Sequence, residues 1–348
     1  MGMTERLDRF QRRHPAAGFP IAVVYKFADD QGTYLAALIT YYGFLSVFPL
    51  LLLFATVLGF VLRGHPELQQ QVLDSTLSEL PVIGGQLGDP RRLGGGTTGL
   101  VIGILGALYG GLGGAQAVQY AMNTAWAVPR NRRPNPIAAR GRSLLLLGTI
   151  GLVVLATTVL STLGSTSVAS DSALVRTGLT ALSVVVNGAV FVLGFRLGTT
   201  RRLTARQVAP GALAAAVVWQ LLQSFGGVYV THVVRTASAT NAVFAVVLGL
   251  IAFLYVAALA LVLCVEVDAV RVDRLHPRAL LTPFTDSVEL TEGDQRVYTD
   301  AAQAQTAKGF QTVEVSFDPA RGPDHRPDRR PEQAEQEAQQ EAEQAPDR

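Results

Sequence analysis

The sequence predicts an all-α integral membrane protein, a bundle of six transmembrane helices with a disordered acidic C-terminal tail. The first observation is a set of six long apolar stretches, which are Leu35–Leu62, Gly99–Ala127, Ser143–Leu163, Thr177–Phe195, Val208–Val230 and Ala242–Val267. None of them contains Lys or Arg, and Glu266 is their only acidic residue. A helix needs about 20 apolar residues to cross a bilayer. Because the stretches lack the alternation of barrel strands, we expect each to be a helix.

The second observation is the charge of the connecting segments, which alternates along the chain. Lys and Arg are concentrated before the first stretch, in the second and fourth connections, and after the sixth stretch. The other connections hold only Arg63, Arg91, Arg92, Arg176 and Arg235. Because positively charged residues stay in the cytoplasm, we predict cytoplasmic N and C termini. The chain is then a multi-pass protein of the bacterial cytoplasmic (inner) membrane.

The same patterns divide the chain into four regions. They are a cytoplasmic or interfacial segment (1–34), the transmembrane domain (35–275), a cytoplasmic extension (276–318) and an acidic Gln/Glu-rich tail (319–348). In the first region we expect Lys26 to face water. In the third, Val313, Val315 and Phe317 alternate like a short strand. The tail cannot bury enough apolar surface to fold, so we expect disorder. The external connection 63–98 has helical leucine spacing, which predicts an amphipathic helix.

The overall charge of +2 hides an acidic tail and a basic remainder. The basic residues at the cytoplasmic surface can attract anionic lipid headgroups, although ordinary control of topology explains them as well. The arginines lack the interleaved aromatic residues of a single-strand binding platform, so we expect no nucleic-acid partner. Cys264 is the only cysteine, and the five histidines form no HxxxH or HExxH pattern. We therefore expect no metal, no cofactor and no enzyme activity.

The second stretch carries the clearest polar stripe, and it permits two interpretations. Gln116, Gln119, Tyr120 and Asn123 are spaced so that they share one helical face. Polar residues avoid lipid, so this face should point into the protein. There it could line a substrate path or only form interhelical hydrogen bonds. The glycine pairs that precede the stripe favour close packing of two helices.

Other residues in the stretches extend the candidate site. The complete candidate polar path is Gln116, Gln119, Tyr120, Asn123, Asn187, Gln220 and Gln223. Pro49 is a candidate kink in the first helix, which could open a cavity or simply shape the bundle. Glu266 is a candidate coupling carboxylate, since an acid inside a membrane is often functional. The alternative is a Glu near the membrane surface that pairs with a loop arginine such as Arg196 or Arg202.

Several of these residues belong to motifs of one family. The motifs are Tyr34–Leu53, Gln119–Trp126, Pro210–Ala212 with Trp219, Phe225 and Tyr229, and Phe253–Tyr255 through Glu266. Together they resemble the signatures of the YihY/virulence factor BrkB family. The chain departs from the family where Cys264 and Val265 replace Gly-Ala before the Glu, and where Thr240 and Asn241 replace Tyr-Gly.

The resemblance implies a six-helix inner-membrane protein. Some family members carry a ribonuclease BN label, which this chain does not support because it lacks the clustered His and Asp residues of a metal-dependent nuclease. We expect a transporter-like protein that moves or exchanges a lipid or amphiphile through a polar interior. The alternative is a non-transporting scaffold or envelope-integrity factor whose tail recruits a cytoplasmic partner. The sequence leaves homo-oligomer formation open.

Overall fold

The computed structural model describes residues 3–61, 96–135, 137–148, 173–229, 239–282 and 288–317. All regular structure within these residues is helical, and they contain no strand. The predicted amphipathic helix in 63–98, most of the third apolar stretch and the 319–348 tail lie outside the described residues. An all-helical fold is the outcome expected for a chain whose apolar runs lack two-residue alternation.

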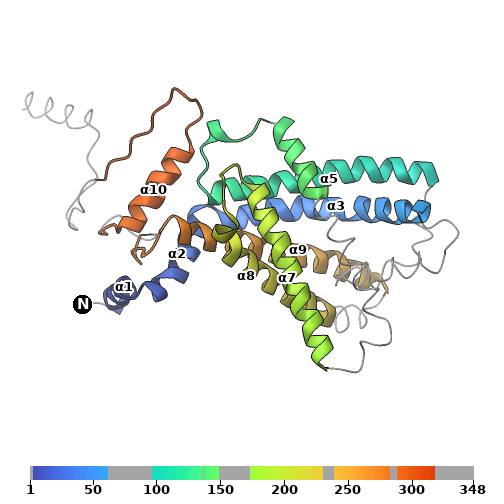
Figure 1. Cartoon of the computed structure of the whole chain (residues 1–348), viewed down its shortest axis with the longest axis horizontal. Coiled ribbons are helices and arrows are strands. Elements are labelled where there is room, and N and C mark those ends of the chain that lie inside the picture. Colours follow the sequence, from blue (N-terminus) through green and yellow to red (C-terminus); the bar gives the residue numbers. More distant parts are fainter. Residues whose placement is uncertain are drawn as a thin grey trace, which may run out of the picture.

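Long helices coincide with five of the six apolar stretches. They are α3 (Gly32–Val61), α5 (Gly96–Ala125), α7 (Ala173–Gly198), α8 (Ala205–Tyr229) and α9 (Ala239–Val272). A further helical segment, 137–148, covers the start of the third stretch. The shorter elements are α1 (Met3–Arg13), α2 (Pro15–Asp29), the 3-10 turn η2 (Arg130–Arg132) and α10 (Glu292–Ala304). Figure 1 shows α1, α2 and α10 at the same end of the bundle.

Only one stretch of the described helices, Val247–Val272 in α9, is long and apolar enough on its own to cross a membrane. Gly32–Val47 and Val185–Gly198 are shorter apolar segments of the same kind. The crossing of a membrane by six helices therefore stays a prediction.

The extension after α9 contains a helix, α10, but no strand at the described residues where an alternating pattern predicted one. Residues 311–317 have no regular structure, so the strand prediction at Val313, Val315 and Phe317 is wrong. The helix α10 was not predicted from the sequence. Thr291 caps its N-terminus: the Thr291 hydroxyl accepts from the backbone N–H of Asp294, and the Asp294 carboxylate accepts from the backbone N–H of Thr291. Such a capping box satisfies two amides that the first turn leaves free.

The helices α3 and α5 pack along each other through small residues, as the glycine pairs predicted. We call this contact the glycine seam; it consists of Gly106, Gly110 and Gly113 of α5 with Pro49, Ser46 and Tyr42 of α3. A Cβ atom added to Gly110 would lie 2.7 Å from the Cα atom of Ser46. Small residues allow helices in lipid to gain van der Waals contact where no hydrophobic force acts. Pro49 lies inside the continuous helix α3, and its ring packs against Gly106 of α5.

The helix α8 lies between α7 and α9, and α9 in turn packs on α2 and α3 (Figure 1). Two side chains of α9 reach the α8 backbone around Pro210. Proline has no N–H, which leaves the carbonyl of Arg206 without its helical donor. The guanidinium of Arg271 donates to that carbonyl at 3.3 Å, and Asp268 accepts from the N–H of Gly211 at 2.9 Å. Gly211 is required because a Cβ atom there would collide with α9.

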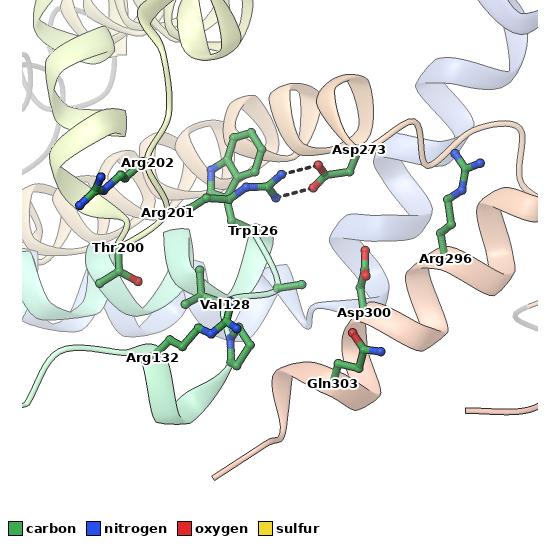
Figure 2. Close-up of a pocket in the computed structure, with 12 residues that line it drawn as sticks. Trp126, Val128, Arg132, Thr200, Arg201, Arg202, Asp273, Arg296, Asp300 and Gln303 are labelled. Carbon is green, nitrogen blue, oxygen red and sulfur yellow. Dashed lines mark hydrogen bonds and ion pairs between the residues drawn. The ribbon is translucent and has the colours of Figure 1, made fainter. Parts of the chain in front are cut away.

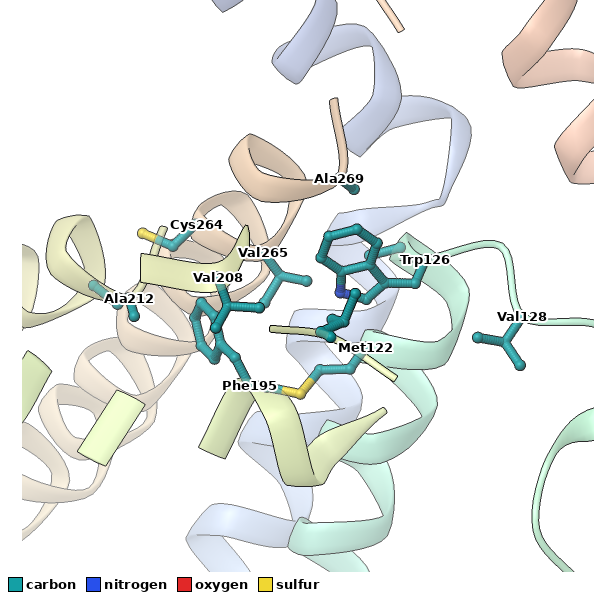
Figure 3. Packing of buried hydrophobic residues seen from close by; sticks show 12 residues of the cluster. Met122, Trp126, Val128, Phe195, Val208, Ala212, Cys264, Val265 and Ala269 are labelled. Atoms are coloured by element: carbon teal, nitrogen blue, oxygen red, sulfur yellow. The ribbon is translucent and has the colours of Figure 1, made fainter. Parts of the chain in front are cut away.

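The main hydrophobic core lies where α5, α7, α8 and α9 approach the same end of the bundle. Met122, Trp126, Phe195, Val208 and Val265 are its larger buried members (Figure 3). A second, smaller cluster joins α2, α9 and α10. These two clusters fix the positions of the connections that follow α5, α7 and α9, and those connections lie together at one end of the bundle.

Candidate functional site

The predicted polar stripe of α5 is divided between buried and exposed residues. Gln119 and Asn123 are buried, each with 4% of its surface exposed. Tyr120 is 49% exposed, and Gln116 is exposed as well. The guanidinium of Arg133 lies over the Tyr120 ring at 5.2 Å. The four residues therefore do not share one environment.

The two buried amides of the stripe connect α5 to neighbouring segments. Gln119 donates to the hydroxyl of Ser143 at 2.8 Å and to the carbonyl of Ala139 at 3.3 Å. The side-chain oxygen of Asn123 accepts from the hydroxyl of Thr199 and from both the N–H and the hydroxyl of Thr200, at 3.0–3.2 Å. These contacts support the interhelical hydrogen-bond interpretation for Gln119 and Asn123.

The remaining members of the predicted path stay predictions. Asn187 lies partly buried on α7, and Gln220 lies partly buried on α8. The side chain of Gln223 lies outside the described residues. No member of the predicted path whose side chain the structure describes lines the cavity that Trp126, Arg201 and Asp273 border.

Glu266 is fully buried, and its partner is not a loop arginine. The ammonium of Lys26 on α2 lies 3.7 Å from its carboxylate, and it also donates to Asp30 and to the carbonyl of Ala125. The expected pairing with Arg196 or Arg202 is therefore wrong, because Arg196 donates to the Leu203 carbonyl instead. The prediction that Lys26 faces water is also wrong, since only 3% of it is exposed.

Lys26 is buried because the carboxylates around it compensate the cost of removing its charge from water. Burial alone would lower the pKa of Lys26, but the charges of Glu266 and Asp30 together raise it above its usual value. Lys26 therefore carries its charge at neutral pH. Neither oxygen of Glu266 has a hydrogen-bond partner among the described residues.

A second buried cation joins the N-terminal helices to α10. Arg278 is 1% exposed; its guanidinium donates to Asp294 at 2.5 Å and to Asp29 at 3.0 Å. Its backbone carbonyl accepts from the side chain of Gln11 on α1. We call the buried pairs of Lys26 with Glu266 and Asp30, and of Arg278 with Asp29 and Asp294, the charged end of the bundle. Within it, residues far apart in sequence compensate one another.

A cavity of about 660 Å³ opens beside the charged end. The connection after α5 contributes Trp126 to Pro129 and Arg132, and the turn after α7 contributes Thr200, Arg201 and Arg202. The end of α9 contributes Asp273, and α10 contributes Arg296, Asp300 and Gln303 (Figure 2). The connections that the charge pattern predicted to share one side of the membrane thus meet around one cavity.

One wall of the cavity is held rigid by Arg201. Its guanidinium makes two bonds to the Asp273 carboxylate, at 2.6 and 2.7 Å, and lies 5.0 Å from the centre of the Trp126 ring (Figure 2). The hydrogen bonds to Asp273 raise the pKa of Arg201. A guanidinium that is both stacked and doubly hydrogen-bonded has little freedom left. We infer that Arg201 positions the wall, since its charge already has a partner.

Other charged groups of the cavity have no such partner. Among the described residues, neither Arg132 nor Arg202 makes an ion pair or a side-chain hydrogen bond. Asp300 makes none either, and burial, followed by the nearby charge of Asp273, raises its pKa. Arg296 pairs with Glu292 at 3.1 Å. The cavity therefore offers two exposed arginines and one carboxylate that have no ion-pair partner among the described residues, although the charges of Lys26, Arg201 and Arg296 act on Asp300 from a greater distance.

The cavity was not foreseen from sequence, because its lining comes from four segments without a shared motif. In the part of the chain that the structure describes, no three His, Cys, Asp or Glu side chains are grouped as metal ligands would be. Arginine and carboxylate side chains can bind a charged ligand without a metal.

Comparison with known proteins places the chain in a family. The chain is 24% identical over 275 residues to the "Inner membrane protein YhjD" of Escherichia coli (strain K12), an alignment that covers 73% of this chain and 80% of that protein. No solved structure matches the chain. A family model described as "Virulence factor BrkB" matches residues 23–286, which include α3, α5, α7, α8, α9 and the described residues of α2 from Val23 onward. The chain therefore belongs to the virulence factor BrkB family.

Proposed function

We propose that this protein is a multi-pass protein of the bacterial inner membrane that moves or exchanges a lipid or another amphiphile. The family and the name of the similar E. coli protein support the location. The observation that carries the activity is the 660 Å³ cavity, which lies at the end of the long apolar helices and combines Trp126 with charged side chains. An amphiphile needs such a combination, because its headgroup and its chains require different surroundings.

The orientation of the bundle determines from which side the cavity is open. The arginine-rich connections that line it are those that the positive-inside rule assigns to the cytoplasm. Cysteines introduced at Asn135 and Thr204 should then be protected from an impermeant thiol reagent outside the cell, and those at Ser75 and Ser167 should react. The opposite labelling pattern would invert the orientation.

The structure also contains an observation that favours the alternative, a non-transporting scaffold. Between α3, α5 and α9 lies a void of about 10 Å³, lined by Ile39, Ala121 and Val262 among others. This void is too small for a lipid headgroup, so a path between these three helices would require them to move apart. In a transporter, this arrangement would be closed to the opposite side of the membrane.

The two functions are separated by lipid movement in proteoliposomes. The full chain is reconstituted with an acyl-labelled fluorescent phospholipid, a proton gradient is imposed in either direction, and dithionite then bleaches the label in the outer leaflet. Transport predicts more bleaching than in protein-free vesicles. Gln303→Trp, which fills the cavity, should abolish the excess. Gln295→Trp on the same helix, away from the cavity, should leave it unchanged. If the wild-type chain bleaches no more than empty vesicles, the scaffold function replaces the proposal.

A further inference from the structure

The two walls of the cavity carry opposite charges that have no ion-pair partner within 4 Å among the described residues. Arg132 and Arg202 come from the connections after α5 and α7, while Asp300 comes from α10 (Figure 2). The Arg201–Asp273 pair lies between them and is internally neutral. A ligand that complements this arrangement has a negative group toward the two arginines and a positive group toward the carboxylate.

The chemistry of the arginine wall indicates a phosphate. Guanidinium groups present a planar set of donors that matches phosphate oxygens. Thr200 contributes a hydroxyl to the same wall, although this hydroxyl already donates to Asn123. Arg201 is committed to Asp273, which leaves Arg132 and Arg202 for the ligand.

The opposite wall belongs to a segment outside the family match. The matched residues end at 286, whereas α10 begins at Glu292. The buried pair of Arg278 with Asp294 and the burial of Val297 against α9 fix α10 in place. The N–H of Asn131 also donates to the carbonyl of Thr306 at 3.0 Å, which ties the connection after α5 to the end of α10. Asp300 is thus held rigidly across from the arginines.

We propose that the cavity binds a headgroup that contains both a phosphate and a primary amine, with the phosphate at Arg132 and Arg202 and the amine at Asp300. The raised pKa of Asp300 supports this pairing, because a neighbouring ammonium would stabilise its charged form. A volume of about 660 Å³ accommodates a headgroup with part of its chains. This inference rests on the proposed lipid function and adds to it the substrate class and a specificity residue on α10.

The test uses Trp126 as a reporter of binding, since it lines the cavity. The chain contains two tryptophans, and Trp219 lies on α8 against Phe253, so Trp219→Phe in the full chain leaves only Trp126. The probes are short-chain phosphatidylethanolamine, short-chain phosphatidylglycerol and inorganic phosphate, titrated in detergent. We expect phosphatidylethanolamine to bind about tenfold more tightly than phosphatidylglycerol, because only its amine can form a charge-assisted hydrogen bond with Asp300, and one such bond contributes about that factor in affinity. Inorganic phosphate should bind more weakly than either lipid.

Two variants test which wall binds the phosphate and which binds the amine. Arg202→Gln should weaken both lipids about tenfold, whereas Asp300→Asn should remove only the preference for the amine. Gln295→Ala, at an exposed position of α10 that does not line the cavity, should change neither. Equal binding of both lipids, or an unchanged preference in Asp300→Asn, overturns the inference. So does inorganic phosphate that binds as tightly as phosphatidylethanolamine, which would indicate a soluble phosphate as ligand.

The two proposals fail in different ways. If lipid moves in proteoliposomes but Trp126 reports no preference for the amine, the headgroup assignment is wrong and the transport function stands. If Trp126 reports Asp300-dependent binding but no lipid moves, the headgroup assignment stands and the bundle is a lipid-binding scaffold.

Discussion

The glycine seam and the charged end stabilise the same bundle by opposite means. In the seam, Gly110 and its neighbours bring α5 against α3 by having no side chain at all. At the charged end, Lys26 and Arg278 are buried with long side chains and full charges. The seam depends on shape, and each of its contacts is weak. The charged end depends on partners, because a buried charge without one is very unfavourable.

The difference determines how each region should respond to substitution. A charge that loses its partner stays buried and uncompensated, which costs far more than the pair contributes. A glycine of the seam that gains a methyl group forces the neighbouring backbone or side chain to shift, which costs about 1–3 kcal/mol. We therefore expect the largest losses of stability at the charged end and intermediate losses in the seam.

The largest effect should follow from removing the partner of Arg278. Asp294→Asn removes the charge next to a guanidinium that is 1% exposed, and the expected loss is about 3–5 kcal/mol in the free energy of unfolding. Glu292→Gln provides the matched control, because its pair with Arg296 is exposed on the same helix and should contribute less than about 1 kcal/mol. Thermal unfolding in detergent measures both. Similar losses in the two variants would contradict the importance of burial.

The next effect concerns the Lys26–Glu266 pair. Lys26→Met leaves the carboxylate of Glu266 buried without a cation and should cost about 3 kcal/mol. The double variant Lys26→Met/Glu266→Gln should recover the part of that loss that comes from Glu266, while Asp30 still lacks its cation. Additive losses would show that the two residues do not interact.

The same pair can distinguish a coupling role for Glu266 from a structural one. Glu266→Gln keeps the shape and removes the titratable charge. A coupling carboxylate predicts that lipid movement loses its pH dependence while the variant stays folded. A structural pair predicts unchanged pH dependence in whatever fraction of the protein remains folded.

The positions of the helices could be predicted from sequence, but the partners of the charges could not. Apolar length is a local property, so five stretches gave helix ends within a few residues of those observed. The pairing of Lys26 with Glu266 depends on how α2 meets α9, and nothing local encodes it. The helix α10 was missed because it has few apolar residues, although Thr291 followed by Asp294 carries the signal of a capping box.

The candidate site was predicted only in part for a similar reason. The spacing of Gln119 and Asn123 correctly placed both on an inward face of α5. Spacing could not reveal that Ser143 and Thr200 would satisfy them, because those residues lie in other helices and turns. The cavity is the product of four such connections, and it became visible only when they were placed together.

An intermediate effect is expected in the glycine seam. Gly110→Ala places a methyl group 2.7–2.9 Å from backbone and side-chain atoms of Ser46, and should cost about 1–3 kcal/mol. Gly194→Ala on α7 is the control, because no atom lies within 4 Å of the added Cβ. Alanine has a higher helix propensity than glycine, so Gly194→Ala should be neutral or slightly more stable than the wild type. Equal changes in the unfolding temperature of the two variants would contradict a tight contact at Gly110.

The smallest effect concerns the polar stripe, which lies between the two regions on α5. Asn123→Ala removes three accepted hydrogen bonds from the turn after α7, and Gln119→Ala removes two donated bonds to the 137–148 segment. Each should cost about 0.6–2 kcal/mol, which is typical of polar contacts between membrane helices. Gln116→Ala, at an exposed position of the same stripe, should leave the unfolding temperature unchanged.

The lipid-movement assay in proteoliposomes then tests whether the polar stripe also lines a substrate path. If Gln119 and Asn123 act only through hydrogen bonds, activity per folded molecule should stay constant in all three variants. If the stripe lines a path, Gln116→Ala should lower activity without any change in stability, since its side chain bonds to no other described residue. The exposed residue of the stripe is therefore the more informative one, because its loss affects function without affecting the packing that holds α5 in place.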